Sequence, residues 1–492
     1  MWTYDLAREQ APSYEHLRRL LEVTRGGGYN AFGLYMEHRF AYPSAPQFAG
    51  MGAVTPEMVA ALENEFPDIQ IIPFVNLLGH FEGLLYTEAG RRYREELFRG
   101  LQACPSCAEF VELAGSLLKD VLQVFSSPIV HIGGDETWQL GLCPRCTARM
   151  AGWEGDAKAR LYGEHFGPLA QQVIDAGRRP AVWGDMFQEH PSAVEILPKE
   201  TLIFDWQYFK SPLETSREFM QKGFDVVCCP SVQTYNSVWC HLTESELNVR
   251  DAFLAAEEID AEGVCVTTWE CGLFGNYETL LPLIEGAGKF LSAGEPAQRW
   301  NEWSQIMGVD LPKLGGVFGH TEIRSSLKCR LLLYSNPFLA WLHHHEELAG
   351  DAGTKAHALL DHAMQVAEGP SERGVTQFVI KAIEFVRYAD QARQAYAQEL
   401  PGVAIASLAP CRQIFEDLER IAVATQVNIG GSIADVHRCR FAREAVERAI
   451  RRIKDFGDGS LGYLPAFEVI THPNFVPHDQ ACWWLINSWA RE

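Results

Sequence analysis

The first part of the chain alternates between short runs rich in β-branched and aromatic residues and longer stretches of helical composition. The runs predict eight strands, at Trp2–Leu6, Ala31–Met36, Ile69–Leu77, Ile129–Ile132, Pro180–Trp183, Leu202–Trp206, Asp225–Cys229 and Gly263–Trp269. The stretches between them predict helices, among them Tyr14–Val23, Pro56–Glu65, Ala108–Val124 and Ala157–Asp175. Eight strands that each precede a helix are typical of an α/β fold of the closed (β/α)8 type, a TIM barrel.

Beyond about Pro296 the strand pattern fades, and apolar residues recur at helical spacing. This spacing is clear in residues 375–389 and 441–453, where Arg and Glu occupy the opposite face. The sequence therefore predicts a barrel over residues 1–295, followed by a mostly α-helical C-terminal domain or extension over residues 296–492.

Composition and charge narrow the classes of function. The chain has 492 residues, of which 47% are hydrophobic, and 42 Lys and Arg against 64 Asp and Glu give a net charge of −22. This composition excludes disorder as the main state and argues against a nucleic-acid backbone or an anionic membrane as the partner. The start of the chain lacks a basic and apolar leader, so we expect a cytoplasmic protein. The sequence leaves the oligomeric state open, a homo-oligomer included.

Polar, titratable and aromatic side chains follow every predicted strand. In chain order they are Asp5 and Arg8, Glu37 and His38, Asn76 and His80, Asp135 and Glu136, Trp183 and Asp185, Trp206 and Tyr208, Gln233 and Tyr235, and Trp269 and Glu270. The carboxyl ends of the strands are the face on which barrel enzymes build their active sites. Three of these residues are tryptophans, which are costly to expose and suit the flat apolar face of a ligand.

The most informative stretch is a short apolar strand that ends in Gly133-Gly134-Asp135-Glu136. The glycines allow a sharp turn and the close approach of a ligand. Adjacent carboxylates repel each other, so we expect one to be the stronger acid, which suits acid–base hydrolysis. The alternative is a surface Asp-Glu pair in a loop, which does not account for the two preceding glycines.

The stretch from His131 to Glu136 resembles the signature of family 20 glycoside hydrolases, the β-N-acetylhexosaminidases. Further stretches resemble that family in the same order, namely Asn76-Leu77-Leu78-Gly79-His80, Trp183-Gly184-Asp185, Trp206, Tyr235 and Thr268-Trp269-Glu270. The resemblance covers about residues 1–290. It implies an exo-acting, retaining enzyme that removes terminal β-linked GlcNAc or GalNAc, with the substrate's own acetamido group as the nucleophile and an oxazolinium intermediate.

The resemblance also implies roles for individual residues. Glu136 would be the general acid, Asp135 would hold the acetamido N–H, and Tyr235 would bond the acetamido oxygen. The remaining roles are sugar stacking by Trp183, Trp206 and Trp269, contacts to the outer hydroxyls by Glu270 and Asp185, and support behind the acid by Glu37, His80 and His131. The family's Arg before the first-strand Asp would fall before Met1, so either the true start of the chain lies upstream or Asp5 or Arg8 substitutes for this Arg.

The sequence leaves two other classes of function open. One is a metal-dependent barrel hydrolase that uses His80, His131 and Asp135, and the other is a carbohydrate-binding barrel without catalysis. The intact Asp135-Glu136 pair favours the glycosidase, which needs no cofactor for catalysis. Its partners would be terminal N-acetylhexosamine glycans or oligosaccharides.

Two Cys-x-x-Cys pairs form a separate motif, Cys104 with Cys107 and Cys143 with Cys146. They lie on segments that follow the third and fourth predicted strands, which are neighbours in a barrel. Four thiolates could meet there around a structural zinc ion. The alternative is a set of free or partly paired thiols.

Overall fold

The computed structural model describes residues 1–7, 10–50, 52–96, 100–232, 242–269, 280–294, 358, 361, 364–365, 370–424 and 435–462. The chain forms two compact units. The first comprises Met1–Ser231, Leu247–Thr268 and Ala287–Glu295, and the second comprises Val232–Glu246, Trp269–Gly286 and Pro296–Glu492. The predicted boundary at residues 295 and 296 stays a prediction, because residues 295–357 lie outside the described part of the chain.

The first unit is built on eight parallel strands, each paired with the next one along the chain. They are β1 (Trp2–Asp5), β2 (Ala31–Tyr35), β3 (Gln70–Phe74), β4 (Ile129–His131), β5 (Arg179–Trp183), β6 (Leu202–Trp206), β7 (Val226–Cys229) and β8 (Gly263–Val264). The barrel closes just after β8, where Trp2 pairs in parallel with Val266. The TIM barrel and its eight strands are thus confirmed, although β3 and β8 end earlier than predicted, at Phe74 and Val264.

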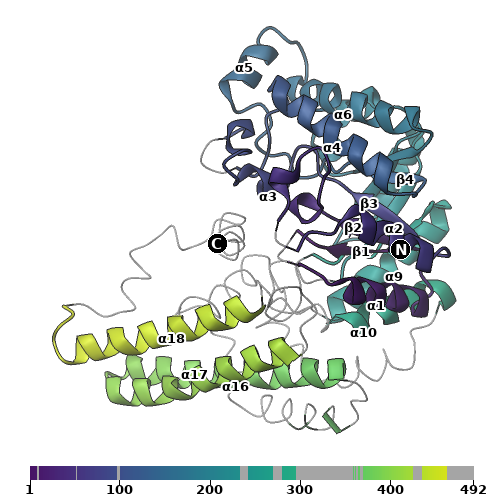
Figure 1. Cartoon of the computed structure of the whole chain (residues 1–492). Coiled ribbons are helices and arrows are strands. Elements are labelled where there is room, and N and C mark those ends of the chain that lie inside the picture. Colours follow the sequence, from purple (N-terminus) through teal and green to yellow (C-terminus); the bar gives the residue numbers. More distant parts are fainter. Residues whose placement is uncertain are drawn as a thin grey trace. The chain divides into compact units, whose positions relative to one another are not determined.

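Helices follow the strands (Figure 1). The α-helices are α1 (Tyr14–Gly26), α2 (Pro56–Glu65), α3 (Glu82–Leu85), α4 (Ala108–Val124), α5 (Pro144–Met150), α6 (Ala157–Asp175), α7 (Met186–Glu189), α8 (Leu213–Gln221), α9 (Leu242–Ile259) and α10 (Leu281–Ala293). Short 3-10 turns lie at η1 (Glu37–Arg39), η2 (Pro46–Phe48), η3 (Arg91–Tyr93) and η4 (Pro191–Ile196). Side-chain caps begin some of these helices: at α1, Ser13 accepts a bond from the backbone N–H of His16, and at α6, Asp156 accepts one from that of Ala159.

The interior of the barrel is filled by aromatic side chains that the strands direct inward. The His131 ring stacks on Phe74 with centroids 4.4 Å apart and lies 4.4 Å from Trp183, and Phe204 contacts all three. Trp183 and His131 have no exposed surface. Because large side chains from successive strands occupy the centre, the barrel is a packed core, and a ligand has to bind at its rim.

Because two of its histidines are buried, we expect acid to destabilise the first unit. Burial lowers the pKa of His16 to about 3 and that of His165 to about 4, because a charged imidazole loses its hydration there. The unfolded chain therefore takes up protons first, and stability present above pH 6.5 is lost as the pH falls toward 4. The loss is about 3 kcal/mol for His165. We expect the melting temperature to fall between pH 7 and pH 4.5, and less steeply in His165→Gln; equal slopes for both proteins would contradict this.

The described part of the second unit contains three long helices, α16 (Pro370–Ala397), α17 (Pro401–Ala424) and α18 (Asp435–Gly457), and α17 packs against both others (Figure 1). Phe385 of α16 packs on Phe415 of α17, with ring centroids 4.8 Å apart. The predicted helical periods over residues 375–389 and 441–453 fall within α16 and α18, so the helical character of this region is confirmed. In the described residues, no helix combines the length and apolarity needed to cross a bilayer.

Candidate active site

Three acidic or basic residues at consecutive strand ends have a left-handed backbone. They are Glu37 after β2 (φ 40°), His80 after β3 (φ 45°) and Glu136 after β4 (φ 47°). This conformation is costly for residues with a side chain, and it persists where the surrounding structure holds it in place. Strain of this kind at three neighbouring strand ends marks this edge of the barrel as the candidate site.

The loop after β4 requires glycine at two positions. Gly133 (φ 80°) and Gly134 (φ 102°) both have a left-handed backbone. A Cβ on Gly133 would lie 2.7 Å from Oδ1 of Asn76, and one on Gly134 would lie 2.3 Å from the hydroxyl of Tyr162. That hydroxyl donates a 2.8 Å hydrogen bond to the carbonyl of Gly134. The loop that carries Asp135 and Glu136 is therefore packed closely against both Asn76 and Tyr162.

This packing gives a stability prediction. Gly134→Ala should lower the free energy of unfolding by about 1–3 kcal/mol, because it adds a backbone strain of that order as well as a clash with Tyr162. Gly177→Ala is the matched control, since Gly177 has a φ of 74° with nothing near its would-be Cβ. Chemical denaturation should show the larger loss for Gly134→Ala. Equal losses in the two variants would contradict the clash.

His80 brings the two carboxylates of the motif together. Its Nε2 lies 2.8 Å from Oε2 of Glu136 and 3.5 Å from Oδ2 of Asp135, and its Nδ1 lies 3.9 Å from Oε1 of Glu82. The side chain of Glu136 is 26% exposed, and that of Asp135 is 10% exposed. Glu136 is thus the more accessible of the two carboxylates.

The environment of His80 favours the imidazolium form. Burial works to lower the pKa of His80, but the charge of Asp135 and hydrogen bonds to Glu136 and Glu82 outweigh it and hold this pKa well above the usual value. A charged His80 donates through Nε2 to Glu136.

Asp185, after β5, holds the backbone of Glu136. Its Oδ2 accepts a 2.8 Å bond from the N–H of Glu136, and its Oδ1 accepts a 3.2 Å bond from Nε1 of Trp206. Burial, followed by the charge of Asp135, raises the pKa of Asp185 well above its usual value. Both oxygens have protein donors, so the geometry favours a positioning role, while the predicted sugar contact stays a prediction.

The other predicted residues fall into three groups. Asp5 and Trp183 are completely buried, and His131 lies beneath the rim, where its Nδ1 accepts a 3.1 Å bond from the N–H of Gly133. Trp206, whose ring stacks on Tyr208 at 5.0 Å, and Trp269 are partly exposed. Residues Arg8, Tyr235 and Glu270 lie outside the described residues.

Glu37 and Asn76 support the loop of His80. Oε2 of Glu37 accepts a 3.2 Å bond from the N–H of Gly83, and Nδ2 of Asn76 donates a 3.2 Å bond to the carbonyl of His80. The sequence reasoning missed Glu82 and Tyr162, whose contacts with the site residues follow from the fold. For Glu82, its place two residues after His80 was the available signal; Tyr162 lies within a helix and gave none.

The structure brings three of the four predicted cysteines together, Cys104, Cys143 and Cys146, and adds Glu95 to them. Among the described residues, this is the group of His, Cys, Asp and Glu whose ligand atoms lie close enough to hold a metal ion. Cys107 is outside the group, and its thiol donates a 3.3 Å bond to Oε2 of Glu109. The group is separate from the candidate site at the strand ends.

Comparison with known proteins shows similarity to a family of glycoside hydrolases. Residues 68–304 match the catalytic-domain model of glycosyl hydrolase family 20. Human "Hexosaminidase D" is 26% identical over 188 residues, which cover 37% of this chain and 38% of that protein, so the match spans about two fifths of the relative's length. Flavobacterium johnsoniae chitobiase has a similar fold, with a TM-score of 0.50 at 15% identity over 90% of this chain and 77% of that one.

A family 20 exo-β-N-acetylglucosaminidase from Vibrio harveyi, solved with N-acetylglucosamine, aligns with a TM-score of 0.47 at 20% identity, over 67% of this chain and 56% of that one.

Proposed function

We propose that this chain is a glycoside hydrolase that removes terminal β-linked N-acetylhexosamine, a proposal supported by the match of residues 68–304 to the catalytic-domain model of glycosyl hydrolase family 20. The proposed substrates are glycans or oligosaccharides that end in GlcNAc or GalNAc. The proposed reaction is retaining and exo-acting, with the acetamido oxygen of the substrate as the nucleophile.

The observation that carries this proposal is the group formed by His80, Asp135 and Glu136. The two carboxylates are neighbours in sequence, and one imidazole nitrogen lies within 3.5 Å of both. A retaining enzyme with its own nucleophile instead sets two carboxyls across the scissile bond. Two carboxylates on one side suit a reaction in which the substrate supplies the nucleophile and the protein supplies an acid and an orienting group.

In the proposed first step, Glu136 donates its proton to the leaving glycosidic oxygen as the bond to the anomeric carbon breaks. The acetamido oxygen attacks that carbon and forms the oxazolinium ring, while Asp135 accepts a hydrogen bond from the acetamido N–H. The charge on His80 stabilises the carboxylate that Glu136 becomes. Glu136 then removes a proton from water as the water opens the ring, which restores the acid.

The residues around Glu136 hold it for both steps. Asp185 accepts from its N–H, His80 contacts its carboxylate, and Tyr162 holds the preceding glycine. Orientation of this kind lowers the barrier because less freedom is lost in the transition state. Tyr235, Trp269, Glu270 and Arg8 keep their predicted roles in this proposal. Asp5 and Trp183 are completely buried, which does not favour the direct sugar contacts predicted for them.

The two alternative functions gain no specific support. For a metal-dependent hydrolase, His131 would have to be a ligand, but its Nδ1 accepts from Gly133 and its ring packs between Phe74 and Trp183. A binding barrel without catalysis would not need an imidazole poised beside Glu136.

The direct test is an assay of the purified chain with chromogenic aryl β-N-acetylglucosaminide and its galacto epimer. We expect hydrolysis of at least one epimer, with the β-anomer as the first product seen by NMR. A folded protein that turns over neither epimer would contradict the proposal, and a first product of α configuration would contradict retention.

A further inference from the structure

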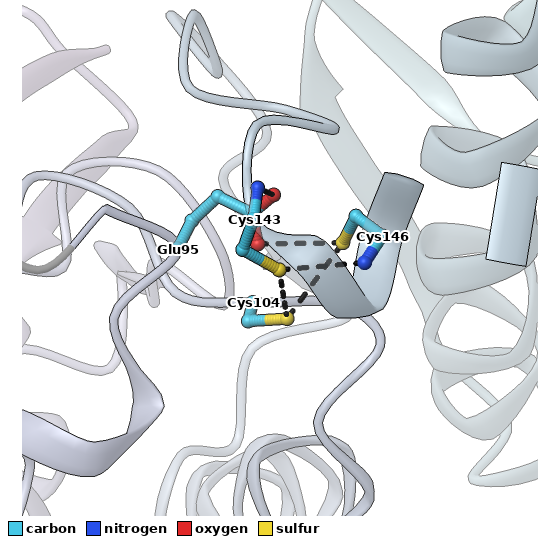
Figure 2. A group of neighbouring side chains, drawn as sticks. All are labelled: Glu95, Cys104, Cys143 and Cys146. Carbon is cyan, nitrogen blue, oxygen red and sulfur yellow. Dashed lines mark hydrogen bonds between the residues drawn. The ribbon is translucent and has the colours of Figure 1, made fainter. Parts of the chain in front are cut away.

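Two neighbouring segments carry the chemical groups of the candidate site. The first runs from β3 to α4 and bears His80, and the second runs from β4 to α5 and bears Asp135 and Glu136. Gln102 and Gln139 join them, because each backbone N–H donates to the other's side-chain oxygen, at 3.2 and 3.1 Å. Beyond this pair, the same segments meet again at Glu95, Cys104, Cys143 and Cys146 (Figure 2).

The four side chains of this group converge on one point. The sulfur of Cys104 lies 3.4 Å from that of Cys143 and 3.7 Å from that of Cys146, and the latter lies 3.3 Å from Oε2 of Glu95. Four ligand atoms, one from each residue, all lie within 4.8 Å of one another. In a tetrahedral zinc site with Zn–S bonds of about 2.3 Å, neighbouring sulfurs are about 3.8 Å apart. A disulfide would need about 2.05 Å.

The start of α5 presents two of the ligands. Cys143 precedes the helix, Pro144 is its first residue, and the N–H of Cys146 donates to the sulfur of Cys143 at 3.4 Å. Oε1 of Glu95 accepts a 2.9 Å bond from the N–H of Cys143, which leaves Oε2 directed at the sulfurs. The sequence pattern Cys-Pro-Arg-Cys thus builds half of the site locally.

Burial indicates that this group needs a cation. The side chains of Cys104, Cys146 and Glu95 are at most 3% exposed. A buried carboxylate beside three thiols is costly to keep unless a positive charge compensates it. Thiolates select soft or borderline metal ions, and a closed set of four protein ligands is typical of a structural zinc site.

We propose that Glu95, Cys104, Cys143 and Cys146 bind one Zn²⁺ and that this ion fixes the segment of His80 against the segment of Glu136. The ligand set differs from the four cysteines expected from the sequence, because Glu95 occupies the position expected for Cys107. The ion takes no part in the chemistry. It is a cross-link between two loops whose inner ends form the His80–Glu136 contact.

Metal analysis of protein purified in reductant without chelator tests this site. We expect about one zinc per chain, lost in Cys104→Ser and Cys143→Ser, and about tenfold or more weaker binding in Glu95→Gln. Cys107→Ser, from the same Cys-x-x-Cys motif as Cys104, is the matched control and should keep its zinc. A wild-type protein free of metal, or loss of zinc in Cys107→Ser as complete as in Cys104→Ser, would overturn the proposal.

Cobalt exchange into the wild-type protein covers the case in which a ligand variant does not fold. The Co²⁺ form should show the d–d bands of tetrahedral cobalt. Its thiolate-to-cobalt charge-transfer band should have the intensity that corresponds to three bound sulfurs, and this intensity should be unchanged in Cys107→Ser. A charge-transfer intensity that corresponds to four sulfurs, or the d–d bands of octahedral cobalt, would overturn the proposed ligand set. Both readouts are independent of turnover, so an inactive zinc-loaded protein would contradict the proposed hydrolase alone.

Removal of the ion by a chelator tests the cross-link. It should lower the melting temperature of the wild-type protein and leave that of Cys104→Ser unchanged. The main effect of chelation should be the lower melting temperature. In assays well below that temperature, the effect on turnover by the protein that remains folded should be smaller. Abolition of turnover with no change in melting temperature would show a catalytic ion and overturn the structural role.

Discussion

Replacement of Glu136 by Gln is expected to reduce hydrolysis of N-acetylhexosaminides with poor leaving groups by about 10²–10⁴-fold, the usual contribution of a general acid. Gln has the shape of the protonated carboxyl but cannot transfer a proton. Aryl substrates with good leaving groups need little protonation, so their glycosylation step should slow much less. The measurement is kcat/KM for a series of aryl N-acetylglucosaminides whose leaving groups span a range of pKa.

Glu154→Gln is the control for this series, because Glu154 is an exposed glutamate on a loop before α6. Its kcat/KM should equal that of the wild type for every substrate. A similar loss across all leaving groups in Glu136→Gln would contradict the acid role and indicate a defect in binding or folding.

The second large effect concerns the acetamido group of the substrate. An oriented internal nucleophile contributes on the order of 7–11 kcal/mol to barrier reduction, and a sugar without the group has no nucleophile to offer. Plain β-glucosides and β-galactosides should therefore show little or no turnover. A thiazoline that mimics the cyclised intermediate should bind far more tightly than the substrate, because the site is complementary to that state.

Asp135→Asn separates orientation of this group from the fold. Its amide keeps the size of the side chain but removes the charge that favours the acetamido N–H, so activity on N-acetyl substrates should fall while the melting temperature changes little. Hydrolysis of an unmodified β-glucoside as fast as its acetamido counterpart would contradict the mechanism. A covalent sugar adduct on Asp135 or Glu136, detected by mass spectrometry, would also contradict it.

The barrel could be predicted from the sequence because its signals are local. Each strand is a short apolar run, and the bounds of α2, α4 and α6 match the predicted ones because Thr55 and Asp156 cap α2 and α6 and Pro56 opens α2. The turn of Gly133 and Gly134 is also local, since only glycine adopts that backbone beside Asn76 and Tyr162 without a clash. The position of Asp135 and Glu136 at a strand end follows from that turn.

Contacts between distant segments depend on the tertiary structure. Asp185 accepts from Glu136 across 49 residues, His80 reaches Glu136 across 56, and Glu95 accepts from Cys143 across 48. No spacing rule relates such positions, because barrel closure and loop packing decide which side chains meet.

The direction of a side chain is the other quantity that the tertiary structure decided. Trp183 and Trp206 both end strands, yet Trp183 is buried against Phe74 and His131, while Trp206 is partly exposed and bonds Asp185. Likewise, the sequence determined that two Cys-x-x-Cys pairs lie on neighbouring segments, but packing turned Cys107 toward Glu109 and brought Glu95 to the other three cysteines. A strand or turn pattern specifies where a residue lies along the chain, whereas the side of the barrel that its side chain faces follows from the register of all eight strands.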